Sequence, residues 1–214
     1  MQIAIAGLGS SGSYLLRLLT NAGFNVSGFD PKREGFYIPC GYAANSNTMK
    51  DLLSLVDIEF SRYIESEAGE ITFSGSSQKK VRFKSLGLVT FDKNRLEADL
   101  LKGCKWERKK LSGSFDLIVD ATGISRYFLP AEDDYRMHTT EYLTSLPEKK
   151  DFQFNYFPKG SGYFWIFPMG DKYHVGAGSS SMSGIKESLS SYSAEKVVSR
   201  DIRLKPLLRS SYEK

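Results

Sequence analysis

The feature that most constrains the fold is GLGSSG at residues 7–12, which stands between an apolar run and an amphipathic segment. Residues 2–6 (QIAIA) predict a buried strand, and residues 13–22 predict a helix with one apolar face. A second strand is expected at residues 25–29, and Asp30 follows it directly. This order of strand, glycine turn, helix, strand and acid is typical of a dinucleotide-binding βαβ unit.

Each glycine of this unit has a physical task. Gly7 permits the tight turn, Gly9 lets the backbone approach a pyrophosphate, and Gly12 lets helix and strand pack closely. The helix N-terminus offers free N–H groups, and the carboxylate of Asp30 can accept hydrogen bonds from a ribose. The predicted cofactor contacts are Gly7, Gly9, Ser10, Ser11, Gly12 and Asp30. The alternative is a glycine turn in some other α/β protein.

After the second strand, the sequence differs from that of a simple NAD-binding domain, in which a third parallel strand follows after one more helix. The next strong buried strand comes only at residues 115–123 (FDLIVDATG). The intervening sequence predicts a loop at 31–47, a helix at 48–60, a hairpin at 70–84 and a helix at 92–102. A long insertion at this point is typical of FAD-binding domains. Because small residues end the strand, we predict that Ala121, Thr122 and Gly123 lie beside the dinucleotide.

The second half of the chain predicts a sheet and a helix. Residues 151–178 alternate apolar and polar side chains, which indicates an antiparallel sheet with aromatic side chains on one face. A helix is expected at residues 185–199, and Gly170-Asp171 is expected to form a hairpin turn. His138 and His174 lie in predicted strands and are interpreted as structural.

These elements together predict an α/β fold, in which a Rossmann-like FAD-binding domain carries an inserted antiparallel β-sheet substrate subdomain. The expected division is a FAD-binding domain at residues 1–62 and 86–126, the substrate subdomain at 63–85 and 127–183, and a helix with the C-terminal tail at 184–214.

Four stretches of the sequence resemble the geranylgeranyl reductases, a family with the flavoprotein hydroxylase-like fold. They are GLGSSG with Asp30, PCGYA at 39–43, FDLIVDATG at 115–123 and YFWIFP at 163–168. The second and fourth are the more particular to that family. The resemblance implies an FAD-dependent oxidoreductase that reduces carbon–carbon double bonds of isoprenoid chains, as in archaeal-type lipids, by hydride transfer from reduced flavin. It also implies an isoprenoid or lipid substrate and either NAD(P)H or a ferredoxin as electron donor.

The resemblance also implies roles for individual residues. Pro39, Cys40 and Gly41 would lie beside the flavin ring. The loop setting of Cys40 between Pro39 and Gly41 makes it the candidate catalytic residue and proton donor, and the alternative is a small buried apolar side chain. Lys93 stands where the family often has an arginine on the FAD pyrophosphate, and Arg95 is a candidate substitute. An apolar substrate tunnel would be lined by Tyr163, Trp165, Phe167 and Pro168. The alternative is that these aromatic side chains are ordinary sheet-face or core residues.

The sequence departs from the family most clearly toward its C-terminal end. Such flavoproteins have a later strand ending in Gly-Asp, followed by a helix that holds FAD, and nothing after Gly170-Asp171 resembles that segment. We therefore expect the chain to lack the C-terminal part of the family, so that a further segment or a second chain would complete the site.

Composition narrows the remaining function classes. A net charge of +4 gives no reason to predict nucleic-acid binding, and Cys40 and Cys104, the only cysteines, form no metal-binding pattern. Neither a secretory leader nor a membrane span is predicted, so a cytoplasmic location is expected, with peripheral membrane contact left open. Two other functions stay open, a flavin-dependent monooxygenase and a truncated, non-catalytic dinucleotide-binding module.

Overall fold

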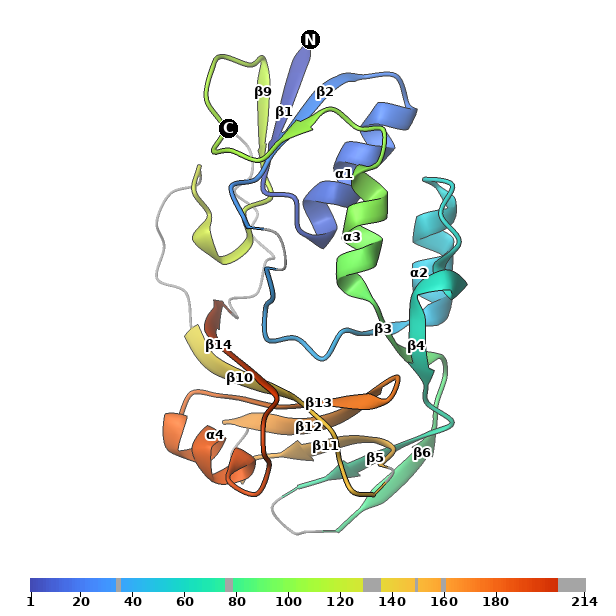
Figure 1. Cartoon of the computed structure of the whole chain (residues 1–214), viewed down its shortest axis with the longest axis vertical. Coiled ribbons are helices and arrows are strands. Elements are labelled where there is room, and N and C mark those ends of the chain that lie inside the picture. The colour runs from blue at the N-terminus through green and yellow to red at the C-terminus, as the bar shows by residue number, and fades with distance from the viewer. Residues whose placement is uncertain (34–35, 76–78, 129–135, 149, 159–160, 204–214) are drawn as a thin grey trace.

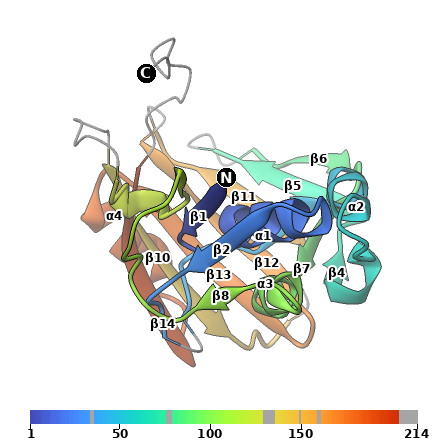
Figure 2. The same cartoon turned by 90° about the horizontal axis from the view of Figure 1, so that it is seen from above.

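The computed structural model describes residues 1–33, 36–75, 79–128, 136–148, 150–158 and 161–203. Figure 1 shows a small parallel sheet in the upper part of the molecule and a larger sheet in the lower part. The chain segment at residues 36–42 runs between the two sheets. Figure 2, seen from above, shows the parallel sheet lying over the middle of the larger one.

The parallel sheet has the strand order β8-β2-β1-β9 and contains the glycine turn. Its strands are β1 (Gln2–Ala6), β2 (Asn25–Phe29), β8 (Trp106–Glu107) and β9 (Leu117–Asp120). Apolar side chains of β1, β2 and α1 (Ser10–Asn21) form its core, among them Ile5, Leu16 and Val26. Because β2 and β9 flank β1 on opposite sides, the carboxyl ends of β1 and β9 form a topological switch point, where open α/β sheets bind ligands.

A three-stranded sheet and two helices follow the glycine-containing unit. The elements are β3 (Ala43–Asn45), α2 (Ser46–Ser54), β4 (Ile64–Glu67), β7 (Leu88–Phe91) and α3 (Lys93–Leu101). The predicted helix at 92–102 is confirmed, and the Asp92 side chain caps it by accepting a bond of 3.0 Å from the Arg95 N–H. Because the cap fixes the start of α3 at Lys93, Lys93 and Glu97 lie near the N-terminus of this helix, which packs against α1.

Two predictions for this region were wrong. The expected loop at 31–47 contains β3, because Ala43–Asn45 pair with the distant strand β7, which local composition does not reveal. The expected helix at 48–60 ends at Ser54, and a 3-10 turn at Phe60–Tyr63 follows. The chain reverses at Asp57, whose φ of +58° is incompatible with a continuing helix.

The large sheet has the order β14-β10-β13-β12-β11-β5-β6. Its strands are β5 (Glu70–Ser74), β6 (Val81–Lys84), β10 (Arg136–Thr144), β11 (Phe152–Tyr156), β12 (Gly162–Met169), β13 (Lys172–Ser179) and β14 (Lys196–Arg203). Neighbouring strands pair antiparallel except β5 with β11, which are parallel. The predicted hairpin at 70–84 therefore extends the predicted sheet at its edge.

The two faces of the large sheet have different roles. On one face, Phe164, Ile166 and Val175 pack against Ile185 and Leu189 of α4 (Met182–Leu189). The opposite face carries Trp165 and Phe167 toward residues 36–42 and the parallel sheet. Aromatic side chains of β12 therefore alternate between a helix-covered core and the interior between the two sheets.

The end of the chain corrects one further prediction. The helix expected at 185–199 is only α4, and residues 196–203 form the edge strand β14 beside β10. The predicted hairpin turn at Gly170-Asp171 is confirmed, with Gly170 at a φ of +66° between β12 and β13. The predicted α/β fold class is confirmed, the proposed domain boundaries stay a prediction, and residues 204–214 of the expected tail lie outside the described residues.

Candidate functional site

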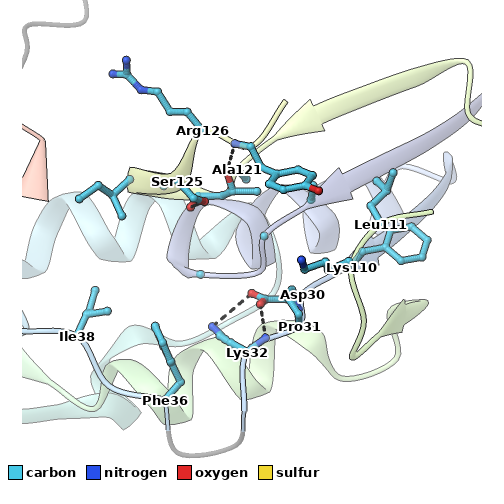
Figure 3. A pocket seen from close by; sticks show the side chains of 18 of the residues that line it. Asp30, Pro31, Lys32, Phe36, Ile38, Lys110, Leu111, Ala121, Ser125 and Arg126 are labelled. Carbon is cyan, nitrogen blue, oxygen red and sulfur yellow. Dashed lines mark hydrogen bonds and ion pairs between the residues drawn. The ribbon is translucent and has the colours of Figure 1, made fainter. Parts of the chain in front are cut away.

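A cavity of about 670 Å³ opens at the carboxyl ends of β1, β2 and β9. Figure 3 shows Asp30 and Lys32 facing each other on one side of it, with Phe36 and Ile38 from the following segment nearby. Its lining comes from the glycine turn, the end of β2, the segment 36–39, α3 and the chain after β8 and β9, and it includes Gly7, Gly9, Asp30, Lys32, Pro39, Lys93, Glu97, Lys110, Ala121, Thr122, Gly123 and Arg126.

The three glycines of the turn have distinct steric surroundings. A Cβ on Gly7 would lie 2.4 Å from the carbonyl oxygen of Ala121, and one on Gly12 would lie 1.9 Å from that of Gly7. A Cβ on Gly9 would meet only the Glu97 carboxylate, at 4.0 Å. Gly7 and Gly12 are therefore required by packing, whereas Gly9 keeps its backbone open toward the cavity.

Asp30 fastens the glycine turn to the end of β2. Its carboxylate accepts bonds from the N–H groups of Leu8, at 2.6 Å, and Lys32, at 2.8 Å. The predicted partner of a ribose is thus also an internal anchor, since it satisfies a backbone donor within the turn itself. It lines the cavity at the same time, so a ligand hydroxyl could donate to a remaining lone pair.

A charged cluster formed by Ser10, Lys32, Lys93 and Glu97 lies beside the N-terminus of α1. Glu97 accepts bonds from the Lys93 ammonium at 2.6 Å, the Ser10 hydroxyl at 2.9 Å and the Lys32 ammonium at 3.2 Å. Burial raises the pKa of Glu97, but the two lysines and Ser10 together outweigh it, so this pKa lies below its ordinary value. Sequence reasoning missed Glu97, although Lys93 and Glu97 are spaced as an i, i+4 pair on a helix.

The cavity lining carries more positive than negative side chains. Lys32, Lys93, Lys110 and Arg126 line it together with the carboxylates Asp30 and Glu97. This balance, next to a helix N-terminus, suits an anionic ligand such as a diphosphate.

Some of the predicted cofactor residues lie outside this lining. The Arg95 guanidinium lies 5.6 Å from the ring of Tyr63 and bonds to the carbonyl of Arg62, away from the cavity. Ser11 is exposed at the start of α1, and Ser10 points to Glu97. Cys40 and Gly41 follow the lining residue Pro39 and lead from the cavity to the large sheet.

The segment Pro39-Cys40-Gly41, here called the PCG loop, packs directly on the aromatic face of β12. A Cβ on Gly41 would lie 2.2 Å from Cδ2 of Phe167 and 3.4 Å from Nε1 of Trp165. Trp165 and Phe167 are buried, whereas Tyr163, whose ring centroid lies 5.5 Å from that of Trp165, is 38% exposed. The structure thus brings the two most family-specific stretches together.

This aromatic face extends beyond the predicted residues. Phe154 of β11 lies 4.9 Å from Phe167, between ring centroids, and stacks on Phe73 of β5 at 5.1 Å. Pro168 does not share this face, because successive residues of a strand point to opposite sides of the sheet and Pro168 directly follows Phe167. Its carbonyl oxygen accepts a hydrogen bond from the Thr90 hydroxyl. Sequence reasoning assigned Tyr163, Trp165, Phe167 and Pro168 to the substrate site and did not include Phe73, because β5 joins this face only through its long-range pairing with β11.

A buried polar cluster lies beneath the PCG loop. The hydroxyl of Tyr37 lies 2.8 Å from Oε1 of Glu141 and 2.7 Å from Nε2 of His174. Glu141 on β10 is fully buried, and His174 on β13 is nearly so. Burial raises the pKa of Glu141 to about 8 and lowers that of His174 to about 4. Sequence reasoning missed Tyr37 and Glu141 and treated His174 as structural; the one available signal was a single acid within the strand HTTEYLT.

Comparisons with known proteins define the fold. No protein-family model matches the chain. An uncharacterized protein of Methanocaldococcus jannaschii is 26% identical, over 82% of this chain and 60% of the relative. A geranylgeranyl bacteriochlorophyll reductase-like protein of Thermoplasma acidophilum superposes with a TM-score of 0.76 at 15% identity, over 94% of this chain and 66% of that chain. The chain thus spans less than two thirds of the relative, and about two thirds of the solved protein.

Two further solved structures show the breadth of chemistry on this fold. The flavin-dependent halogenase CmlS has a TM-score of 0.66 at 16% identity, over 94% of this chain and 49% of its own. A probable FAD-dependent monooxygenase of Pseudomonas aeruginosa has a TM-score of 0.58 at 14% identity, over 83% of this chain and 60% of that chain. Among the described residues, no helix is long and apolar enough to cross a membrane. The chain therefore has the fold of FAD-dependent oxidoreductases, and the resemblance found in the sequence is confirmed at the level of the fold.

Proposed function

We propose that the cavity binds FAD with its ADP half at the glycine turn. The observation that supports this is the open backbone of Gly9 beside the N-terminus of α1, in a lining with excess positive charge. Asp30 would accept from the ribose, and Lys32 and Lys93 would exchange their bonds to Glu97 for bonds to the diphosphate. Ala121, Thr122 and Gly123 would lie along the cofactor.

We further propose that the protein is an oxidoreductase that reduces carbon–carbon double bonds of isoprenoid chains. The observation that carries this proposal is the packing of the PCG loop on Trp165 and Phe167, which joins the cavity to an aromatic face. Bound FAD, once reduced, would supply the hydride. The aromatic side chains would hold the apolar chain and exclude water, and the thiol of Cys40 would donate the proton.

Further proposals concern partners and location. An isoprenoid lipid and an electron donor, either NAD(P)H or a ferredoxin, would be the partners of a cytoplasmic protein that contacts membranes peripherally. Since the chain spans 60% of its relative, a further segment of polypeptide or a second chain would complete the cofactor site. The activity proposed is that of the completed protein.

The test has two steps. The purified chain is mixed with FAD and passed through gel filtration, and a retained flavin spectrum supports the cofactor site. The flavin-loaded protein is then reduced without oxygen and incubated with a geranylgeranylated lipid, whose gain of hydrogen is followed by mass spectrometry. Retained flavin with an unchanged lipid, in the 214-residue chain and in a longer natural form alike, would refute the reductase proposal.

The second candidate is a flavin-dependent monooxygenase, since the fold is shared with a probable enzyme of that class. Oxygen uptake coupled to NAD(P)H oxidation would favour it over the reductase.

The third candidate function is that of a non-catalytic dinucleotide-binding module, which the partial coverage of the relatives favours. This candidate predicts binding of ADP without retention of FAD, so stoichiometric FAD after gel filtration would refute it.

A further inference from the structure

The buried polar cluster beneath the PCG loop contains several atoms whose hydrogen-bonding capacity is unused. Among the described residues, Oε2 of Glu141, Nδ1 of His174, Nε1 of Trp165 and the hydroxyl of Tyr42 lack a hydrogen bond of good geometry. Nδ1 of His174 nevertheless lies 3.6 Å from Oε1 of Glu141, and the Trp165 indole lies close enough to Glu141 to lower its pKa. Buried polar groups with such incomplete hydrogen bonding cost stability, so their concentration in one cluster calls for a functional explanation. The cluster lies beside the aromatic side chains of β12, since His174 pairs with Phe167, and Glu141 and Trp165 both pair with Gly176. This position suggests a role in the proposed reaction.

The geometry of the cluster allows only a few proton arrangements. Tyr37 has one hydroxyl hydrogen and lies within hydrogen-bond distance of both Glu141 and His174. If Glu141 is a carboxylic acid, it donates to Tyr37, and Tyr37 donates to a neutral His174. If Glu141 is a carboxylate, Tyr37 donates to it, and a protonated Nε2 of His174 donates to Tyr37. The bridge therefore converts one arrangement into the other by moving protons within two hydrogen bonds.

Burial decides which arrangement is populated. A charged carboxylate and a charged imidazole are both penalised at these buried positions, and burial is the main cause that raises the pKa of Glu141 and lowers that of His174. Tyr37, the backbone at Cys40 and the nearby Trp165 indole lower the pKa of Glu141, but together they do not outweigh burial. The neutral arrangement, with the proton on Glu141, is therefore favoured near neutral pH. The cluster is thus a proton store inside the protein with an acceptor, His174, at its other end.

The backbone of Cys40 lies against this store, close enough to Glu141 and His174 to shift the pKa of both side chains through hydrogen bonding. Burial is the main cause that raises the pKa of the Cys40 thiol, and Glu141 raises it further. A thiolate formed at Cys40 would therefore hold a proton more tightly than Glu141 does, so proton transfer from Glu141 to Cys40 would be favourable.

We infer that Glu141, bridged by Tyr37 to His174, is the positioning residue that returns a proton to Cys40 after each reduction. This inference rests on the proposed function. On that function, bound reduced FAD would supply a hydride to the double bond, and the Cys40 thiol would supply the proton, which would leave a thiolate. Glu141 then gives its proton to that thiolate and becomes a carboxylate, and solvent reprotonates Glu141 before the next turnover. Atoms and charges balance with reduced FAD as the only reductant.

Other charged groups near the cluster enter its pH dependence. On the loop side these are Cys40 and Tyr42, and from α3 Lys93 acts on Cys40 while its ammonium lies 5.5 Å from the Tyr42 ring. From β14, the ammonium of Lys196 lies 4.4 Å from the centroid of the Tyr37 ring. Burial raises the pKa of Tyr163 on β12, and the charge of an ionised Cys40 would raise it further. Because several groups act on the cluster at once, its pH profile is compared between variants rather than read from one curve.

The first experiment tests the store without cofactor or substrate. Infrared spectra at about pH 7 are recorded for the wild type, Glu141→Gln and Tyr37→Phe. We expect a protonated-carboxyl band that is absent in Glu141→Gln and shifted in Tyr37→Phe. Because the chain has only two histidines, ring NMR with His174→Asn assigns the His174 signal, which should remain neutral at about pH 6. An ionised Glu141 or a charged His174 would overturn the inference, whatever the activity.

The second experiment tests the use of that proton. In wild type, kcat for double-bond reduction should fall as pH rises through about 8. Glu141→Gln should lower kcat at about pH 7 by about 10- to 100-fold, leave KM within about twofold and abolish this pH dependence. An unchanged profile in Glu141→Gln would overturn the inference. A protonated Glu141 in a wild-type protein that reduces no isoprenoid would refute the proposed function instead.

Tyr63→Phe is the matched control for Tyr37→Phe. Like the hydroxyl of Tyr37, that of Tyr63 lies within hydrogen-bond distance of a carboxyl group, here Asp99 at 2.7 Å, but Tyr63 packs in a separate core with Leu53 of α2 and Leu96 of α3. Tyr63→Phe should leave the carboxyl band and the pH profile unchanged. Thermal unfolding of both variants shows whether each is folded, and Tyr37→Phe keeps the inference testable if Glu141→Gln fails to fold.

Discussion

The two ends of the candidate site contain the same kind of group, a buried glutamate, in opposite electrostatic settings. Glu97 at the nucleotide end has three donors around its carboxylate, two of them lysine ammonium groups. Glu141 at the sheet end has one oxygen bonded to Tyr37 and the other without a partner among the described residues. The pKa of Glu97 therefore lies below its ordinary value, and that of Glu141 lies well above it.

Under the proposed function, this difference would suit the two ends to two different tasks. At the nucleotide end, tight glycine contacts fix the turn, and Glu97 holds Lys32 and Lys93 where a diphosphate could take over their bonds. The sheet end keeps its acid neutral and its polar atoms partly unsatisfied, as suits a site that exchanges protons among apolar surroundings. The PCG loop connects the two, since Pro39 lines the cavity and Gly41 packs on the aromatic face.

The largest expected effect comes from Gly12→Ala, which tests whether the nucleotide end is as rigid as its contacts indicate. The new Cβ would lie 1.9 Å from the carbonyl oxygen of Gly7 and 3.0 Å from its carbon, both backbone atoms that cannot move without opening the turn. We expect a loss of about 3 kcal/mol or more in the free energy of unfolding. Thermal and urea unfolding of the chain without cofactor measure this loss.

Gly9→Ala is the matched control for that prediction. Its Cβ would meet nothing closer than Glu97, at 4.0 Å, and the φ of Gly9 is −71°, which alanine adopts readily. Stability should stay within about 0.5 kcal/mol of wild type, whereas FAD affinity should fall because the methyl group enters the cavity. Equal stability losses in both variants would show that Gly12 is not packed tightly against Gly7.

The next effect concerns Glu97→Gln, which removes the charge that the two lysines share. Without cofactor, the variant should lose about 1–3 kcal/mol in stability, because Lys32 and Lys93 lose a charged acceptor. FAD should bind tighter by about five- to tenfold at low salt, since a carboxylate no longer competes with the diphosphate for those lysines. Calorimetric titration with FAD and thermal unfolding measure the two effects.

Glu107→Gln serves as its control. The Lys109–Glu107 pair, at 2.8 Å, is half exposed on both sides and lies outside the cavity lining. An exposed ion pair contributes little, so stability and FAD affinity should change by less than about 0.5 kcal/mol. Weaker FAD binding in Glu97→Gln than in Glu107→Gln would mean that Glu97 supports the cofactor rather than competing with it.

The sequence alone predicted the glycine turn and its flanking elements at the nucleotide end, although not Glu97, and it missed the polar cluster of the sheet end, for a physical reason. The turn, α1, β2 and Asp30 follow one another within the first thirty residues, so spacing and composition predict their arrangement. Glu141 and His174 lie 104 and 137 residues after Tyr37, and the two meet only through the pairing of β10 with β13. No local pattern marks a residue whose role depends on such long-range pairing.

Element boundaries failed where long-range contacts decide the conformation. The apolar spacing at 185–199 predicted one helix, but residues 196–203 pair with β10 as β14. Likewise, Ala43–Asn45 become a strand only because β7 lies beside them. Helix starts set by a local capping side chain, such as Asp92 for α3, were predicted well. Elements whose boundaries are set by contacts between residues close in sequence were therefore predicted, and elements set by contacts between distant residues were not.

A third prediction examines Glu141 through the pH dependence of stability. Its folded pKa, about 8, lies above the ordinary value of 4.5, so between these values the folded state holds a proton that the unfolded state has released. Stability from this group is present below about pH 4.5 and is lost as pH rises through about 8. His174 acts oppositely, since its pKa falls from 6.5 to about 4, and its contribution is lost as pH falls through that window.

The contributions of Glu141 and His174 to the pH dependence of stability can be distinguished between pH 6.5 and about 8. In this range Glu141, but not His174, differs in protonation between the folded and unfolded states. Wild type should lose up to about 1.4 kcal/mol of stability per pH unit there relative to Glu141→Gln. Urea unfolding of both proteins at several pH values across this window measures the difference. A difference that is independent of pH would mean that Glu141 is ionised in the folded protein and that the two glutamates of the site do not differ in charge.

The smallest expected effect on folding comes from Tyr163→Ala, at the outer limit of the aromatic face. Tyr163 is 38% exposed, so its removal should cost only about 1–2 kcal/mol of stability. If the face holds an isoprenoid chain, KM for that substrate should rise by about three- to tenfold while kcat changes little, because binding is lost equally in ground and transition states. Val197 on β14, which is an edge strand of the same sheet, is 57% exposed, and Val197→Ala should change neither quantity. Equal KM values in Tyr163→Ala and wild type would place the substrate elsewhere, and the sheet end would then keep its proton store but lose its proposed role in holding the chain that receives the proton.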